Sequence, residues 1–309
     1  MRRWTILGTA SIAAACSGQP VDVGGYTNPE GGGQSQPPDS GSLQGATATI
    51  CLRATTAPVA HNDGLAGQTP SDQKLGIRKL TLLTSANDPS PYVVFDHGAS
   101  AVEAGLNEGN NTAIARLPIS SLRAGNYVKA RVGISHVRYR VAALMHAAGQ
   151  SITGTFDNIH VLSDGSTING QTYNKGHYDF RFEALGSTLG SQSGESGMWP
   201  SVLNTSGIEL DTSGSEASYV FVVNLPIDPK ISTHINVVFE LNTHSNFRWQ
   251  DQTGANYPGY ATNVFDVTPT SYEPVKTFGA NSYRMYVELT AAPGTCQIAP
   301  STVSDAGND

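Results

Sequence analysis

Apolar and polar residues alternate with a period of two through much of this chain, and this alternation limits the folds open to it. In a β-strand successive side chains point to opposite faces, so the pattern predicts strands with one buried face. The clearest such segments, together with one short apolar run at 92–95, are 48–52, 77–82, 178–182, 219–225, 235–241 and 283–289. The turn dipeptides Asp164-Gly165, Asn169-Gly170 and Pro258-Gly259 lie between strand patterns. Only residues 99–106 and 141–148 could instead form short helices.

The composition agrees with a turn-rich β protein. The 309 residues include 33 Gly and 17 Pro, and charged residues make up 14% of the chain, against about 25% in an ordinary soluble domain. Coiled coils, charged disordered tails and basic nucleic-acid-binding proteins are therefore poor fits. We predict an all-β fold, an antiparallel β-sandwich of roughly ten or more strands with long loops. The Ser/Gly-rich segment 185–218 is either a surface loop or a boundary between two subdomains.

One long strand pattern requires a change of face. Residues 128, 130, 132 and 134 are apolar, and the apolar positions then shift in parity to 137, 139, 141 and 143. A strand can keep one face buried through that shift only if it bulges near Ser135-His136. The bulge would place four cations on the solvent side, at Lys129, Arg131, Arg138 and Arg140. Such a basic face could bind an anionic glycan or lipid headgroup, or it could simply be solvated.

The N-terminus has the pattern of an export signal. Met1-Arg2-Arg3 is followed by an apolar stretch over 4–15, which is too short to span a bilayer as a helix. The stretch ends in Ala13-Ala14-Ala15-Cys16, which resembles the lipobox of bacterial lipoproteins, although a Leu is usual where Ala13 stands. The resemblance implies that Cys16 is diacylated and anchors the protein at the outer membrane or cell surface. The alternative is secretory cleavage after an Ala-x-Ala motif, which would leave a periplasmic or secreted protein.

These patterns divide the chain into four parts. Residues 1–16 form the signal peptide with its acylated cysteine. Residues 17–45 are rich in Gly, Ser, Pro and Gln and predict a disordered linker, because they cannot bury enough apolar surface to offset chain entropy. Residues 46–296 form the β-sandwich domain, and residues 297–309 form a disordered tail. The predicted contact with the membrane is through the lipid anchor only.

The three cysteines suggest one disulfide. If Cys16 is acylated, Cys51 and Cys296 remain at the two ends of the domain, in a compartment where a disulfide can persist. We predict that they are bonded, which would stabilise the fold by up to roughly 5 kcal/mol in the chain-entropy model. Bonding would require the first and last strands to be adjacent. The alternative is two buried free thiols.

A short segment adds a second resemblance. Leu117-Pro118 followed by 122–127 (LRAGNY) is similar to the LP…L-x-A-G-x-Y segment of β-sandwich domains in exported bacterial lipoproteins of unknown function. The resemblance covers about a dozen residues; it implies a fold and no activity. Gly125 permits a tight turn and Tyr127 opens the strand.

Sequence motifs for catalysis or metal binding are missing. The eight histidines form neither H-x-H nor H-E-x-x-H, and the chain has no G-x-S-x-G. We therefore predict no catalytic residue, no metal ligand and no cofactor, and we lean toward a protein that is not an enzyme. The alternative is a metal-binding or hydrolytic exported protein that uses His and Asp groups brought together by the fold.

The best candidate binding segment is 246–260. It combines the aromatic residues Phe247, Trp249, Tyr257 and Tyr260 with the polar residues Gln250 and Asp251. Aromatic rings that cover apolar sugar faces, beside amides and carboxylates that hydrogen-bond hydroxyl groups, suit an extracellular glycan. This interpretation requires Trp249, Tyr257 and Tyr260 to be exposed. The alternative is that the aromatic residues pin a long loop onto the core.

Overall fold

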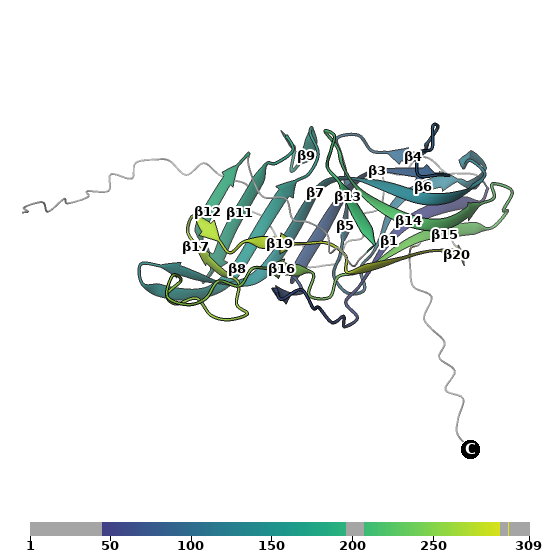
Figure 1. Ribbon diagram of the computed structural model, residues 1–309. Coiled ribbons are helices and arrows are strands. Elements are labelled where there is room, and N and C mark those ends of the chain that lie inside the picture. Colours follow the sequence, from purple (N-terminus) through teal and green to yellow (C-terminus); the bar gives the residue numbers. More distant parts are fainter. Residues whose placement is uncertain (1–44, 196–206, 291–295, 297–309) are drawn as a thin grey trace, which may run out of the picture. The chain divides into compact units, whose positions relative to one another are not determined.

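Strands account for nearly all of the regular structure in this computed structural model (Figure 1). The structure describes residues 45–195, 207–290 and 296. Cys16, most of the predicted linker and the predicted tail lie outside these residues. The one helix among the described residues is the 3-10 turn η1 (Ile119–Ser121), which confirms the all-β prediction. Within this part of the chain, no helix is both long and apolar enough to cross a membrane.

An eleven-stranded sheet forms the larger layer. Its main path runs in the order β12-β11-β8-β7-β14-β13. β3 and β17 also pair with β7; β4 and β5 pair with β3, and β18 pairs with β17. Its strands are β3 (Asp72–Leu83), β4 (Tyr92–Asp96), β5 (Val102–Gly105), β7 (Gly125–Ala147), β8 (Gln150–Val161), β11 (Tyr178–Ala184), β12 (Ser187–Gly194), β13 (Ile208–Asp211), β14 (Ala217–Ile227), β17 (Asp266–Thr268) and β18 (Ser271–Tyr272).

The smaller layer is a four-stranded sheet in the order β20-β15-β1-β6. Its strands are β1 (Thr47–Thr55), β6 (Asn111–Pro118), β15 (His234–Asn242) and β20 (Ser282–Thr290). β1 and β15 pair in parallel, as do β17 and β7, whereas the other pairs are antiparallel. Two small sheets complete the fold, one of β9 (Ser166–Ile168) with β10 (Gln171–Tyr173) and one in the order β19-β16-β2, made of β2 (Ala66–Gln68), β16 (Phe247–Trp249) and β19 (Val275–Thr277).

The long strand β7 holds the large sheet together because it pairs with two strands on each edge. β14 and β8 follow one another along one edge, and β3 and β17 along the other. Where β3 advances from Leu75 to Ile77, its partner on β7 changes from Val137 to Ile134, so β7 contains one extra residue. The predicted bulge at Ser135-His136 is confirmed. Val128, which the sequence assigned to the buried face, is instead exposed.

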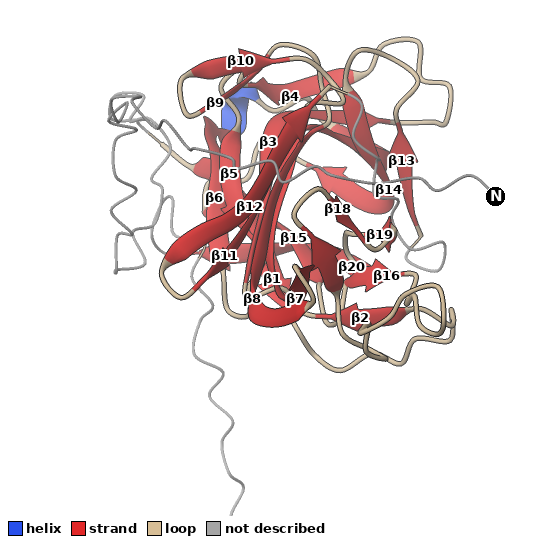
Figure 2. Ribbon diagram, turned by 90° about the vertical axis from the view of Figure 1, so that its left-hand side faces the viewer, coloured by secondary structure: helices blue, strands red, loops and turns tan. Residues whose placement is uncertain are grey.

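The two layers face each other across an apolar core, in which aliphatic side chains are the majority. A void of about 20 Å³ between them is lined only by apolar residues. They come from both layers and include Ile50 and Leu52 of β1, Leu80 of β3, Val132 of β7, Phe221 of β14 and Phe239 of β15. Figure 2 shows the large sheet curving around the strands of the smaller one. A domain of this kind is a curled β-sandwich.

The far part of the large sheet has an aromatic core instead. Beneath β7, β8 and β11, rings from the strands pack against rings from β16 and the β17–β18 hairpin. The Tyr139 and Phe247 centroids are 4.9 Å apart, and those of Phe156 and Phe265 are 5.3 Å apart. Trp249 packs against Phe265 at 5.5 Å. The segment after β15 therefore provides the cover for this part of the sheet.

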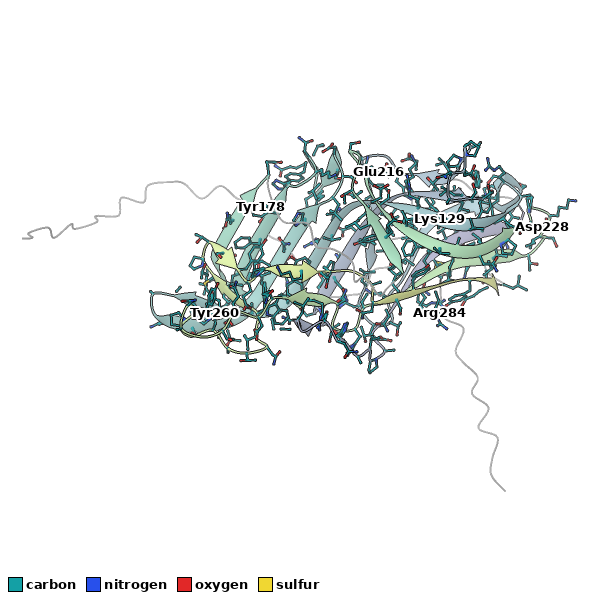
Figure 3. The ribbon with its side chains drawn as sticks, in the orientation of Figure 1. Lys129, Tyr178, Glu216, Asp228, Tyr260 and Arg284 are labelled. Carbon is teal, nitrogen blue, oxygen red and sulfur yellow. A yellow bond between two sulfur atoms is a disulfide. The ribbon has the colours of Figure 1, made fainter. Side chains whose placement is uncertain are left out.

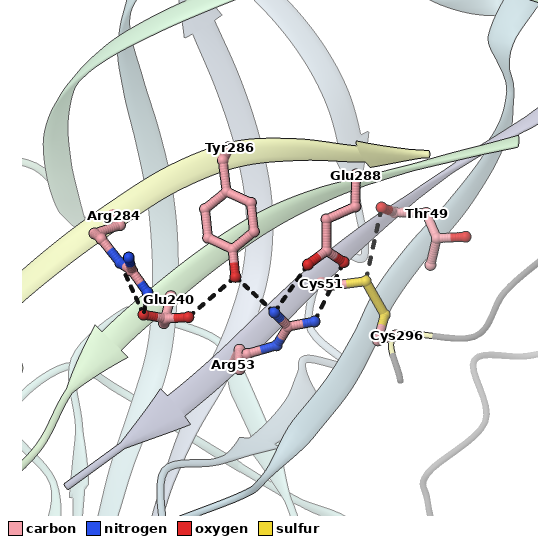
Figure 4. Close-up of polar contacts among 8 residues, drawn as sticks. All are labelled: Thr49, Cys51, Arg53, Glu240, Arg284, Tyr286, Glu288 and Cys296. Carbon is pink, nitrogen blue, oxygen red and sulfur yellow. Dashed lines mark hydrogen bonds and ion pairs between the residues drawn. A yellow bond between two sulfur atoms is a disulfide. The ribbon is translucent and has the colours of Figure 1, made fainter. Parts of the chain in front are cut away.

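Cys51 and Cys296 form a disulfide, as predicted, with their Cα atoms 5.7 Å apart (Figure 4). The expected adjacency of the first and last strands is wrong, because β15 lies between β1 and β20. Cys296 follows the end of β20 by six residues. That length can span roughly 20 Å, whereas two strand spacings need only about 10 Å.

Beside the disulfide, Arg53 pairs with Glu288 at 3.0 Å and donates to the hydroxyl of Tyr286 at 2.6 Å. The Tyr286 hydroxyl in turn donates to Glu240, which also accepts a hydrogen bond from Arg284 at 2.9 Å (Figure 4). Charged groups therefore tie β1, β15 and β20 together on the outer face of the smaller sheet. This network and the disulfide cross-link the same sheet.

Other local expectations are corrected. Residues 102–105 are β5 and residues 141–147 belong to β7, so neither possible helix forms. In β7 the side chains of Val141, Ala143 and Met145 are buried at alternate positions, which is strand periodicity. Segment 185–218 contains β12 and β13, while residues 196–206 lie outside the described part.

Candidate functional site

The candidate site is built on the hairpin that joins β7 to β8. Ala148 (φ 52°) and Gly149 (φ 76°) form its two-residue turn, in which both residues have the left-handed backbone of a type I′ turn. The register places His146 of β7 directly opposite Ser151 of β8. Opposite residues of an antiparallel pair project from the same face of the sheet, so the two side chains meet there.

His146 links Ser151 to a buried carboxylate. Its Nδ1 lies 3.0 Å from the Ser151 hydroxyl, and its Nε2 lies 2.6 Å from Oδ1 of Asp266. Asp266 is completely buried, whereas the His146 side chain is 14% exposed and Ser151 is exposed. The set therefore runs from solvent into the protein. Asp266 is positioned by β17, whose parallel pairing with β7 places Asp266 opposite Leu144.

A second buried carboxylate supports the first. Glu273 accepts hydrogen bonds from the backbone N–H groups of Gln252 at 2.6 Å and Asp266 at 2.8 Å. Burial, with a smaller contribution from the carboxylates of Asp266 and Asp251, raises the pKa of Glu273 to about 7 against the lowering effect of those two hydrogen bonds. Glu273 thus ties the start of loop 250–265 to β17.

Two tyrosines of this loop cover the histidine. The ring of Tyr260 stacks on that of His146, with centroids 4.7 Å apart and planes 21° apart. Tyr257 lies against Tyr260 at 5.4 Å. Both rings are half-buried, so each keeps part of its surface open. Figure 3 shows Tyr260 at the end of the domain where β8 and β17 lie, with Arg284 and Asp228 far from it. Burial and the charges of Asp266 and Glu273 raise the Tyr260 pKa, which keeps its hydroxyl protonated.

A groove opens farther along β8. Thr155 of β8 and residues 183–188, at the β11–β12 turn, line this groove. Its volume is about 420 Å³, and its lining is mostly polar. Thr155 and Ser151 are four residues apart on one strand, so they project from the same face. Leu185, at the tip of the β11–β12 turn, has φ 53° and is 92% exposed. This end of the protein therefore presents hydroxyl groups, a carboxylate and an exposed apolar side chain.

The aromatic segment predicted to bind a ligand is divided by the structure. Trp249 and Phe247 are fully buried in the aromatic core, so the expected exposure of Trp249 is wrong and neither ring is open to a sugar. The reason is that both belong to β16, which covers the large sheet. Tyr257 and Tyr260 keep open surface, Gln250 is exposed, and Asp251 accepts from the N–H of Asn263 at 3.1 Å.

His146, Ser151, Asp266 and Glu273 were not predicted as site residues. One signal was present, because Ala148-Gly149 followed by a strand pattern could have been assigned as a hairpin turn, and that turn fixes the pairing of residues 146 and 151. No sequence signal relates Asp266 to His146, since 120 residues separate them. Across residues 45–195, 207–290 and 296, no three His, Cys, Asp or Glu side chains are arranged to hold a metal ion.

Two of the four cations on the basic face of β7 pair with carboxylates. Arg140 pairs with Asp157 at 2.7 Å and lies 3.8 Å from Glu183, and Arg131 lies 3.6 Å from Asp211. Neighbouring strands thus supply the acidic groups that the sequence of β7 lacks.

Comparisons of the chain with protein-family models, with curated proteins and with solved structures found no match.

Proposed function

We propose that this protein is exported, is held at the outer membrane or cell surface by an acylated Cys16, and binds an extracellular carbohydrate on Tyr257 and Tyr260. The observation that carries the binding proposal is the pair of half-open tyrosine rings, of which Tyr260 stacks on His146 at 4.7 Å and Tyr257 packs on Tyr260 at 5.4 Å. A sugar ring presents apolar C–H faces that stack on such aromatic surfaces. Stacked and hydrogen-bonded supports hold the rings in place before the ligand arrives, which lowers the entropic cost of binding.

Polar groups suited to sugar hydroxyls surround this pair. Gln250 is exposed on the same loop, Ser151 is exposed beneath Tyr260 and His146, and the groove beside Thr155 and Glu183 adds hydroxyl and carboxylate groups. Loops at the end of a rigid β-sandwich are a common place for binding sites. The predicted linker 17–45 would let the domain reach roughly 30 Å from its anchor.

The binding proposal is tested by screening the protein against a glycan array and measuring the affinity for the best hit by calorimetry. Replacing both Tyr257 and Tyr260 with Ala should reduce the affinity at least tenfold, because stacking contacts contribute more than 1 kcal/mol. Tyr173→Ala is the matched control, since Tyr173 also stacks on a histidine, His177, at 4.1 Å, but on the β9–β10 hairpin. An unchanged affinity in the double variant, or equal losses in both variants, would contradict the proposal.

The anchor is tested separately by intact mass and cell fractionation in a bacterial host. Acylation predicts a membrane-bound protein that carries the mass of lipid chains on Cys16 and is released by Cys16→Ser. A freely secreted protein without added lipid mass would contradict the anchor and leave the binding proposal unaffected.

A further inference from the structure

Ser151, His146 and Asp266 are arranged as a nucleophile, a base and a group that orients the base. We propose that they hydrolyse carboxylic esters, with Ser151 and His146 as catalytic residues and Asp266 as a positioning residue. The proposal does not depend on carbohydrate binding. It rests on distances of 3.0 and 2.6 Å and on burial that falls from Asp266 outward to Ser151.

The hydrogen bonds fix the tautomer that such a reaction needs. Asp266 as a carboxylate can only accept, so Nε2 of His146 carries the ring proton and donates it to Oδ1. Nδ1 is then unprotonated and accepts from the hydroxyl of Ser151. A serine whose proton is shared with an oriented imidazole is the activated nucleophile of acyl transfer, and the set is recognised by these roles rather than by chain order.

The strand also offers a backbone donor for the oxyanion. On β7 the N–H of Leu144 donates to Phe265 and that of Ala142 to the Gln68 side chain, so the even residues near this end turn their N–H groups away from β8. His146 is the next even residue, and the partners of Leu144 and His146 are Thr153 and Ser151. In an antiparallel pair these partners must then turn their N–H groups away from β7. In the described part of the chain β11 pairs with β8 no farther than Thr155. The N–H of Ser151 therefore lies at an open strand edge beside its own hydroxyl, where it can donate to a developing oxyanion.

The reaction needs only water as co-reactant. The Ser151 oxygen bonds to the acyl carbon while its proton passes to Nδ1 of His146. The bond from that carbon to the leaving oxygen then breaks, and the proton from Nδ1 converts the leaving group into an alcohol. Water attacks the acyl-serine ester and gives a proton to Nδ1, which returns it to Ser151 as the acid is released. The substrate class is a carboxylic ester, and a small acyl group suits the first test because Ser151 is exposed to solvent.

The test measures hydrolysis of p-nitrophenyl acetate by the purified full chain. Ser151→Ala and His146→Gln should each lower the hydrolysis rate to that of buffer without protein. Asp266→Asn should lower kcat by roughly 100-fold or more with little change in KM, because the imidazole loses its oriented tautomer. It should also change the pH profile of the rate, which a purely structural role would not do.

Thr153→Ala is the matched control, since Thr153 is exposed two residues away on the same strand and lies outside the reacting set. It should keep the wild-type rate. Circular dichroism melting of each variant separates lost catalysis from lost folding. If Asp266→Asn unfolds, Ser151→Ala is the decisive variant, because it removes only an exposed hydroxyl. A Ser151→Ala protein that is folded and hydrolyses the ester at the wild-type rate, or a wild-type rate equal to buffer, would overturn the proposal. Retained glycan binding by Ser151→Ala would leave the binding proposal standing in either case.

Discussion

Two histidines of strand β7, His136 and His146, each link a serine to a carboxylate, and the two sets are buried in opposite senses. In the set at the bulge, Ser135 lies 2.9 Å from Nδ1 of His136, and Nε2 lies 3.0 Å from Glu103. Ser135 is completely buried there, and Glu103 is the partly exposed member. In the set at the hairpin, Asp266 is buried and Ser151 is exposed. The same hydrogen bonds therefore leave a hydroxyl open to solvent in only one of the two.

The surroundings explain this difference. At the bulge, His136 lies under β3, and a Cβ added at Gly76 would come within 2.5 Å of its ring. Sequence and fold thus place His136 inside a packed sheet, where its hydrogen bonds satisfy buried polar groups. At the hairpin Ser151 is exposed, and His146 and the N–H of Ala261 in loop 250–265 both contact Asp266. Identical chemistry serves packing in the first set and is available to a ligand or substrate in the second.

The largest effect should come from removing the support beneath the hairpin set. Trp249→Ala should lower the free energy of unfolding by about 4 kcal/mol, since it empties a large buried site in the aromatic core. Urea unfolding measures this value. A loss under 1 kcal/mol would mean that Trp249 is not a core residue and would restore the exposed-ring interpretation.

Two carboxylates should respond to pH in opposite directions: Glu103 of the bulge set, and Glu273, which accepts from the N–H of Asp266 beside the hairpin set. The pKa of Glu103 is lowered to about 2, first by its hydrogen bond from His136, so its contribution is present above pH 4.5 and is lost as the pH falls toward 2. The pKa of Glu273 is raised to about 7, so its contribution is complete below pH 4.5 and is lost as the pH rises through 7, by up to about 3 kcal/mol.

Hydrogen exchange can follow the pH response. The amides of Gln252 and Asp266, which donate to Glu273, should lose protection between pH 4.5 and 7 beyond the intrinsic change in exchange rate. Glu273→Gln is the control that removes this dependence. A protection factor independent of pH in the wild-type protein would contradict a raised pKa at Glu273.

Removing each histidine should separate the two sets further. His136→Ala should cost about 2.5 kcal/mol, because it leaves a buried void and removes the partner of both Ser135 and Glu103. His146→Ala should cost about 1 kcal/mol, since its side chain is near the surface. Chemical denaturation of both variants gives the comparison. Equal losses would mean that the hairpin set is as structural as the bulge set.

The smallest effects are expected at the two serines. Ser135→Ala removes a buried hydroxyl that bonds to His136 and should cost about 1 kcal/mol. Ser151→Ala removes an exposed hydroxyl and should change stability by less than about 0.5 kcal/mol. Melting curves of the two variants, recorded side by side, measure the difference. A larger loss for Ser151→Ala would assign that serine a structural role.

The sequence predicts one half of this molecule better than the other. Alternation identified β1, β3, β14, β15 and β20 of the sandwich but not β6. The parity change located the bulge at Ser135-His136, because both signals are local consequences of burying one face. The cysteine arithmetic gave the disulfide. The parallel pairing of β1 with β15 is a choice between distant strands that no local pattern specifies.

The candidate site was less accessible to such reasoning. Trp249 and Tyr260 look alike in an aromatic loop, and only the register of β16 against β2 and β19 decides that the first is buried. The hairpin turn at Ala148-Gly149 was hidden by a helix-compatible run of alanines. Asp266 and Glu273 reach His146 and Gln252 through the tertiary fold alone.

The most direct test of the difference between the two sets is covalent labelling with a fluorophosphonate, followed by intact mass and peptide mapping of both serines in one sample. Activated, accessible serines react with this reagent and buried ones do not. We expect a single added group on Ser151, none on Ser135, and no label in Ser151→Ala. A folded wild-type protein that remains unlabelled at Ser151, or that is labelled equally at other surface serines, would contradict this expectation.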